Sequence, residues 1–224
     1  MVRAVLLGTG SPPPNPKRRG PATLLSLDDE RFLVDAGSGV GVQLVQAGVR
    51  PYDYLARDIE VRRAHMRDRE PPAVRVTEIE EGTVMEAGGV RVSAFLVEHD
   101  PVKPAYGFRF DGGGRSVVVS GDTRPCENLA RWAHDVDCLI HECCEMSKTS
   151  WYPGCGWPTV EDKVQDLTSY HTQPDQIGSV AKASRAKGLV MTHLMPGSDP
   201  AELRAAARAR YAGPVVVGED LMEV

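Results

Sequence analysis

The 224-residue sequence contains no run of eighteen consecutive apolar residues, which is about the length that a transmembrane helix requires. Its first residues, MVRAVLLG, hold one basic side chain and an apolar run that breaks at Gly8, which is too short for a secretory signal. We therefore expect neither a membrane span nor a signal peptide.

Cysteines are few and do not fit a disulfide framework. There are five, an odd number, and two of them are adjacent, at Cys143 and Cys144. Paired C-x-x-C motifs with the spacing of a structural zinc site are absent. We expect reduced thiols, which are typical of a cytoplasmic protein, and we expect the adjacent pair to pack as small apolar side chains.

An excess of positive charge is also missing. Lys and Arg number 26 against 31 Asp and Glu, so the formal net charge is −5. A polyanionic partner would need a local basic patch, because binding of nucleic acids relies on phosphate contacts. The small cluster Lys17–Arg19 lies on a proline-rich loop, and we interpret it as solvated. Hydrophobic residues make up 42% and charged residues 25%, which is typical of a soluble globular chain, and we expect one domain over residues 1–224.

Short apolar runs separated by glycine and proline turns predict most of the regular structure. The predicted strands cover residues 2–7, 22–27, 31–34, 74–79, 83–85, 90–97, 106–110, 116–120, 137–140, 188–192 and 215–217. The predicted helices cover residues 40–47, 127–133, 174–186 and 200–207. Strands early in the chain and alternating strand and helix units later in it predict a layered α/β fold.

Several predicted strands end in side chains that bind metals or transfer protons. These side chains are His99, Asp122, His141 with Glu142, and His193. Strand ends gather at one edge of a layered α/β fold, where ligands bind. Imidazole nitrogen and carboxylate oxygen suit zinc or a similar divalent ion. The prediction of a metal site depends on these residues meeting, because a single strand-end histidine is more often structural.

The sequence resembles the metallo-β-lactamase superfamily, nearest its ribonuclease Z and arylsulfatase-like branch. The motifs that carry the resemblance follow one another over most of the chain: LLGTGSP at 6–12, FLVDAG at 32–37, AYGF at 105–108 after His99, SGDT at 120–123, HE at 141–142, HT at 171–172 and TH at 192–193. The resemblance implies a four-layer αββα sandwich, in which two mainly antiparallel sheets carry helices on their outer faces.

The resemblance also implies which residues bind metal. His99 and His193 would be terminal ligands, and Asp122 would be the carboxylate that bridges two ions. Zinc is the expected metal, with manganese as the alternative. Intact relatives hold two ions, and a chain that lacks the signature segment could hold one or none.

Acid and base groups follow from the same resemblance. His141, Glu142 and His171 would be catalytic groups around the metal ligands. His171 would protonate the leaving group, and Glu142 would orient an imidazole, as carboxylates close to metal sites commonly do.

The superfamily signature His-x-His-x-Asp-His is missing, and with it part of one half of the fold near residues 54–58. The only histidine before His99 is His65, which has no histidine partner two or five residues further on, so we interpret it as solvated. Either the natural polypeptide carries a further segment between Tyr54 and Asp58, or the protein keeps only part of the site. We favour the first alternative, because losing a hairpin and its helix would expose apolar faces and unpaired backbone groups.

These observations favour a metal-dependent hydrolase that cleaves small phosphodiesters or sulfate esters with a metal-activated hydroxide. A small ester is the expected partner and nucleic acid is disfavoured, because only residues 100–121 lie where members that cleave transfer RNA insert a long arm. One alternative is a ribonuclease Z-type endonuclease acting on transfer RNA 3′ ends. The other is a catalytically degenerate metal-binding or interaction module.

The aromatic side chains near residue 150 leave two readings open. Trp151, Tyr152 and Trp157 alternate with prolines and glycines. They form either a wall over the metal edge that faces the substrate or a contact between subunits. We expect a homodimer, by analogy with relatives that pair through nearby surfaces.

Overall fold

A computed structural model describes residues 2–11, 15–27, 30–49, 77–149 and 156–224. The predictions for His65, Trp151, Tyr152 and the chain between Tyr54 and Asp58 lie outside these residues. So does the first half of the strand predicted over 74–79. Its described part, residues 77–79, pairs with no described strand, and the carbonyl of Ile79 accepts a hydrogen bond from the Tyr106 hydroxyl (3.0 Å).

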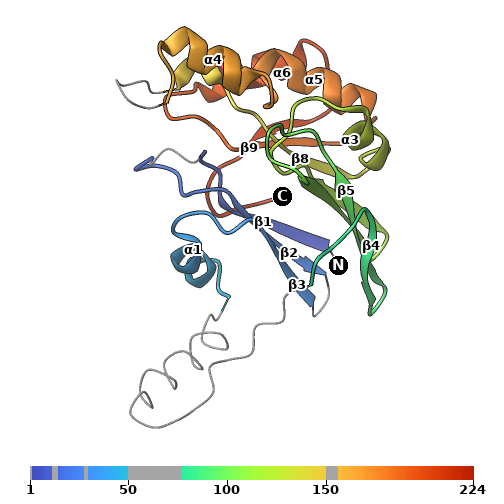
Figure 1. The fold of residues 1–224 in the computed structure, drawn as a ribbon. Helices are drawn as coiled ribbons and strands as arrows, with labels where there is room; N and C mark the ends of the chain where they lie inside the picture. The colour runs from blue at the N-terminus through green and yellow to red at the C-terminus, as the bar shows by residue number, and fades with distance from the viewer. Residues whose placement is uncertain (1, 12–14, 28–29, 50–76, 150–155) are drawn as a thin grey trace.

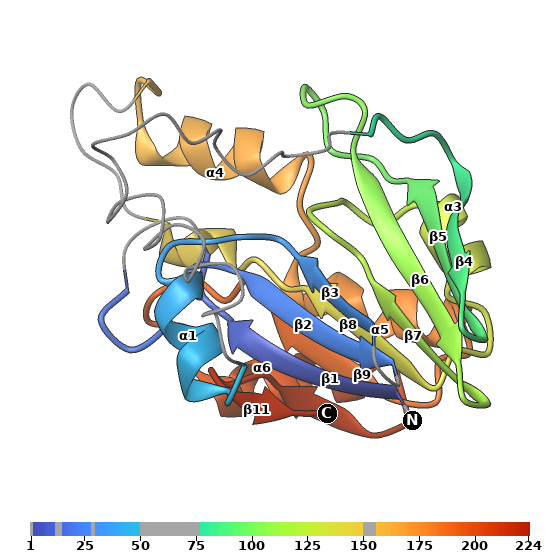
Figure 2. The same ribbon diagram turned by 90° about the horizontal axis from the view of Figure 1, so that it is seen from below.

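Two sheets face each other and carry helices on their outer faces (Figures 1 and 2). The four-stranded sheet has the order β11-β1-β2-β3, with β1 Val2–Gly8, β2 Ala22–Leu27, β3 Glu30–Val34 and β11 Met222–Glu223. The seven-stranded sheet has the order β10-β9-β8-β7-β6-β5-β4, with β4 Gly82–Ala87, β5 Val90–Leu96, β6 Tyr106–Gly112, β7 Arg115–Val119, β8 Cys138–Glu142, β9 Leu189–Thr192 and β10 Val215–Val217. The helices are α1 Val40–Gln46, α3 Glu127–Trp132, α4 Val160–Thr168, α5 Pro174–Ala183 and α6 Pro200–Arg208, with a 3₁₀ turn, η1, at Met146–Lys148.

The alternation of side chains along β1 shows how the layers form. Ala4 and Leu6 point into the core between the sheets, whereas Val5 and Leu7 point to the other face, where α1 packs. On the outer face of the larger sheet, the buried side chains of α3, α5 and α6 form a second large core. The result is the four-layer arrangement that the sequence predicted.

The larger sheet is mixed, whereas two mainly antiparallel sheets were expected. Strands β4 to β7 pair antiparallel, through tight turns between β4 and β5 and between β6 and β7 and through the longer loop 97–105 between β5 and β6, but β7 to β10 pair parallel. Parallel neighbours need long crossovers, and helices supply them on the outer face of the sheet. α3 links β7 to β8, α5 lies between β8 and β9, and α6 links β9 to β10.

Three described elements were not predicted from the sequence, namely η1, α4 and β11. α4 is mostly polar, so its apolar spacing was weak. Its first turn nevertheless holds a capping box, in which Thr159 and Asp162 satisfy each other's backbone donors. Within the described ranges, no helix combines the length and apolar character needed to cross a membrane.

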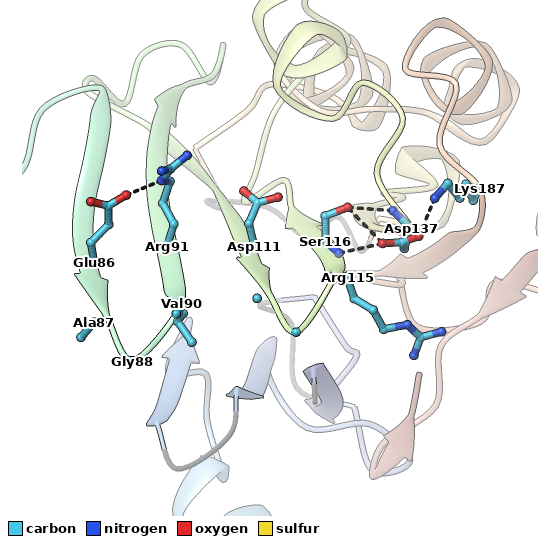
Figure 3. Close-up of a pocket in the computed structure, with 14 residues that line it drawn as sticks. Glu86, Ala87, Gly88, Val90, Arg91, Asp111, Arg115, Ser116, Asp137 and Lys187 are labelled. Carbon is cyan, nitrogen blue, oxygen red and sulfur yellow. Dashed lines mark hydrogen bonds and ion pairs between the residues drawn. The ribbon is translucent and has the colours of Figure 1, made fainter.

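Asp137 joins three segments at the edge of the larger sheet where β7, β8 and β9 begin (Figure 3). Its carboxylate accepts hydrogen bonds from the Ser116 amide (2.7 Å), the Ser116 hydroxyl (3.2 Å) and the Lys187 ammonium (2.7 Å). A cavity of about 740 Å³ lies here among the hairpin turns, at the opposite edge from His99 and Asp122. The hydrogen bond from Lys187, aided by Ser116 and opposed by partial burial, lowers the pKa of Asp137.

Asp137→Ala is expected to lower the free energy of unfolding by about 1–2 kcal/mol at pH 7, because the Ser116 amide loses its acceptor. A carboxylate whose pKa is lowered by folding stabilises the protein above its unfolded pKa, and this contribution disappears as pH falls through the folded pKa. Urea unfolding at pH 7 and at about pH 3 measures both effects. Glu86→Ala removes an exposed ion pair with Arg91 and should change little. An equal loss at both pH values would contradict the prediction.

Candidate metal centre and active site

The predicted site residues lie at one edge of the larger sheet. His99 follows β5, Asp122 follows β7, His141 and Glu142 end β8, and His193 follows β9. Strand β6 separates β5 from β7 and is antiparallel to both, so β5 points the same way as β7, β8 and β9. The carboxyl ends of all these strands therefore meet at one edge, as the sequence analysis expected.

Gly121 lets the chain turn sharply between β7 and Asp122. Its φ is +63°, and a Cβ atom there would lie 2.6 Å from the carbonyl oxygen of Tyr106. Any other residue would combine an unfavourable backbone conformation with a clash against the backbone of the neighbouring strand. The glycine of the SGDT motif therefore fixes where Asp122 lies.

His193 itself adopts a left-handed conformation, with φ of +58°. This conformation is uncommon for a residue other than glycine and is maintained by its surroundings. The amide of Leu194 donates to Thr9 (2.8 Å), and the amide of Ser11 donates to Leu194 (3.2 Å). Thr9 is in turn held by Asp220, which accepts its amide and its hydroxyl. The loop after β1 thus holds the backbone around His193 in place.

Asp122 lies between two imidazoles. Its Oδ1 is 3.2 Å from Nε2 of His193, and its Oδ2 is 4.0 Å from Nε2 of His99. Although 3.2 Å is within hydrogen-bonding range, Asp122 Oδ1 makes no hydrogen bond to any residue that the structure describes. Within the described residues, His99 Nε2, Asp122 Oδ1 and His193 Nδ1 are buried polar atoms without a hydrogen-bond partner. Buried polar atoms without partners are costly, and imidazole nitrogens that converge on a carboxylate fit a divalent cation.

His171 belongs to the same cluster. Ligand atoms of His99, Asp122 and His171 lie within 4.8 Å of one another, and the rings of His99 and His171 are 4.9 Å apart. The Nδ1 atom of His171 lies 3.0 and 3.1 Å from the two carboxylate oxygens of Glu142. Because Nδ1 of His171 contacts Glu142, the other ring nitrogen, Nε2, is the one that can bind a metal ion or a substrate.

Glu142 is completely buried, and its carboxylate oxygens have several hydrogen-bond partners. The Thr123 amide donates to its Oε1, in addition to the contacts with His171. Burial raises the pKa of Glu142 against the opposing effect of His171. Burial would lower the pKa of His171, but the hydrogen bond and charge of Glu142 outweigh it, so the pKa of His171 is raised. The pair is thus suited to holding a proton on His171.

His141 does not line the cavity at the site, although a charge on it would interact with His193. Its side chain is fully buried, and its Nδ1 lies 2.7 Å from the Glu142 carbonyl oxygen. Burial lowers the pKa of His141 to about 4, so its imidazole is neutral. The structure therefore brings together five of the predicted residues: His99, Asp122, Glu142, His171 and His193. His141 is buried and does not line the cavity.

Asp35 lies beside His193, although it was not predicted as a site residue. Its Oδ2 lies 3.9 Å from His193 Nε2, and its φ is +62°. Burial raises its pKa, which the nearby His193 partly opposes. The FLVDAG motif was used only for the resemblance, although an aspartate between a strand and a glycine was a signal that could have identified it.

A half-open cavity of about 210 Å³ adjoins these residues. Asp122, His171 and His193 form its polar side. The remaining lining comes from distant parts of the chain: Ser11, Cys144, Met146, Thr149, Trp157, Lys163, Leu167 and Met195. Cys144 is otherwise buried, and burial raises the pKa of its thiol well above the usual value, so it behaves as the expected apolar side chain.

Two packed sheets with outer helices and a His/Asp cluster at the strand ends define a metal-dependent hydrolase. Comparison with known proteins supports this class. The β-lactamase superfamily domain matches residues 44–194. Ribonuclease Z of Mycobacterium tuberculosis (strain ATCC 25177 / H37Ra) is 30% identical over 277 residues, covering 100% of this chain and 98% of that protein. The chain belongs to the metallo-β-lactamase superfamily, in its ribonuclease Z-like branch, as its motifs predicted.

Solved structures show the same fold. The metallo-β-lactamase fold protein YhfI from Bacillus subtilis superposes with a TM-score of 0.74 at 18% identity, covering 100% of this chain and 98% of that one. The short form of human tRNase Z superposes with a TM-score of 0.65 at 20% identity, covering 99% and 98%. These similarities confirm the layered architecture.

The alignment with the mycobacterial relative also bears on the missing signature. It extends over 277 positions, whereas the chain has 224 residues. Stretches of the relative therefore have no counterpart in this chain. This difference agrees with the absence of the His-x-His-x-Asp-His segment that the sequence analysis noted.

Proposed function

We propose that this chain hydrolyses phosphodiester bonds with a divalent metal held by His99, Asp122 and His193. The observation that carries the proposal is the position of Asp122 between the Nε2 atoms of His99 and His193. Within the described residues, His99 Nε2 and Asp122 Oδ1 are buried without a hydrogen-bond partner. Zinc fits imidazole and carboxylate ligands best, and manganese is the alternative. Three protein ligands suffice for one catalytic ion with an open coordination position.

Such an ion supplies a Lewis acid that activates water and polarises the ester. The side chains around it carry out the remaining tasks. Asp122 offers one oxygen toward each imidazole. His171, with its Nδ1 fixed by Glu142, holds a proton on Nε2 for the oxygen of the leaving group. Glu142, which is buried and hydrogen-bonded, keeps that imidazole protonated and oriented.

For the substrate, the comparisons favour RNA more than the sequence analysis did. The curated relatives are ribonucleases Z and match the whole chain. We therefore place the 3′-end phosphodiesters of transfer RNA precursors first. A second candidate, a small phosphodiester or aryl sulfate, is favoured by the cavity, because about 210 Å³ is less than the roughly 300–1,000 Å³ of most ligand pockets. The expected homodimer and cytoplasmic location stay predictions.

The test compares three substrates with purified protein loaded with zinc or manganese. They are a transfer RNA precursor with a 3′ trailer, bis(p-nitrophenyl) phosphate and p-nitrophenyl sulfate. We expect metal-dependent cleavage of the precursor at the end of its acceptor stem, stopped by a chelator. Cleavage of only the small esters would favour the second candidate. If the metal-loaded protein hydrolyses none of them, the proposal fails and a non-catalytic metal-binding module takes its place.

A further inference from the structure

We infer that the 210 Å³ cavity binds an aromatic ring attached to the scissile ester, and that Trp157 and Lys163 determine this specificity. The inference rests on the proposed function, because it assigns a substrate group to the same site. Trp157 lies just before α4 and Lys163 lies within it, so neither belongs to the metal-binding strand ends.

Two chemically different groups of side chains line the cavity. Asp122, His171 and His193 are polar and would contact the ester. Trp157, Leu167 and the thioethers of Met146 and Met195 line the same cavity and are apolar. A substrate that fills this space must therefore place an apolar group within a few ångströms of its ester.

Two properties of these apolar side chains favour an aromatic group over an alkyl group of equal size. Tryptophan gains more from an offset-stacked or edge-on ring than from an aliphatic surface. Methionine sulfur likewise makes favourable contacts with ring edges. Since Met146, Met195 and Trp157 line one small cavity, their preferences add up on a single bound group.

The indole is held in place before any ligand arrives. Trp157 Nε1 donates a hydrogen bond to Oδ2 of Asp166 (3.0 Å), which lies in the second turn of α4. The capping box of Thr159 and Asp162 fixes the start of α4, which lies between Trp157 and Asp166 in the sequence. Because this geometry belongs to the free protein, little ordering cost remains for binding.

Lys163 adds a positive charge beside the ring. Its Nζ lies 5.1 Å from the centroid of the Trp157 ring and lines the same cavity. An ester that carries both a ring and a negative charge can contact the indole, the ammonium group and the metal ligands at once. Aryl phosphoesters and nucleoside phosphates share this chemistry.

Binding without turnover tests the inference. Calorimetry with the zinc-loaded protein compares phenylphosphonate with cyclohexylphosphonate, which has a similar size but no π system. We expect phenylphosphonate to bind more tightly. Trp157→Ala should weaken its binding by about tenfold, within the range for loss of one stacking contact, and leave inorganic phosphate unaffected. Lys163→Gln should weaken both phosphonates.

The controls separate a local effect from loss of the fold. Gln165→Ala changes an exposed residue of α4 that does not line the cavity, and it should leave every affinity unchanged. Trp157→Leu keeps an apolar side chain and should still abolish the preference for phenyl over cyclohexyl. Equal affinities of the two phosphonates for the unaltered protein, or an unchanged preference in both Trp157 variants, would overturn the inference.

A further arm identifies the source of the ring. Tighter binding of uridine 5′-monophosphate than of phenylphosphonate, lost in Trp157→Ala, indicates a nucleobase. The reverse order indicates a small aryl ester. Ring-selective binding by a protein that hydrolyses none of the substrates above supports the ring site while refuting the proposed function. Hydrolysis without ring-selective binding supports the proposed function and refutes the ring site.

Discussion

Asp122→Asn is expected to remove bound metal and to lower kcat/KM for any phosphodiester by about a thousandfold. The substitution keeps the shape of the side chain but removes the charge that faces both His99 and His193. A metal ion contributes several kcal/mol of transition-state stabilisation, and each 1.4 kcal/mol corresponds to about tenfold in rate. Metal analysis after dialysis and steady-state kinetics with added zinc or manganese measure the two effects.

The fold should tolerate this change. Asp122 carries a buried oxygen without a hydrogen-bond partner, so an amide leaves no broken network behind it. Asp100→Asn is a matched control, because Asp100 is an exposed neighbour of His99 that pairs with Lys103. It should retain both metal and activity. Full metal content in Asp122→Asn would show that this carboxylate is not a ligand and would remove the basis of the proposed site.

Much of the edge where the strands end could be predicted from the sequence because its signals are local. An apolar run followed by a histidine or an acid marks a strand end, and the structure shows that His99, Asp122 and His193 do follow strands. The glycine before Asp122 was part of the same motif, and the structure shows why it is needed. Sheet geometry then brings the strand ends together without further information from the sequence.

The rest of the site depends on tertiary packing, which leaves weaker signals. The aromatic cluster offered Trp157 as part of a wall over the metal edge, and Trp157 does line the cavity with His171. Lys163 lies on a largely polar helix, and no local pattern placed it at this cavity. His141 has the same sequence context as the other strand-end residues, yet its side chain is buried and does not line the cavity. Asp35 reaches His193 only because the first sheet packs against the second.

His171→Ala should discriminate between substrates by their leaving groups. A ribose oxygen must receive a proton as it departs, whereas p-nitrophenolate is stable enough to leave as the anion. Loss of a general acid costs roughly 10²- to 10⁴-fold. We therefore expect kcat/KM to fall by about this factor for a dinucleoside monophosphate and to change little for the p-nitrophenyl ester of the same nucleotide.

Glu142→Gln should show the same discrimination more weakly, by about 10- to 100-fold, because it disturbs the orientation and charge of His171 without removing the imidazole. His134→Ala is the control, since His134 is an exposed histidine that pairs with Asp135 away from the site. A ligand and a proton donor are distinguishable by these kinetics. If His171→Ala slowed both substrates equally and also lost metal, His171 would be a ligand, consistent with its place beside His99 and Asp122, and the leaving group would have to take its proton from another donor.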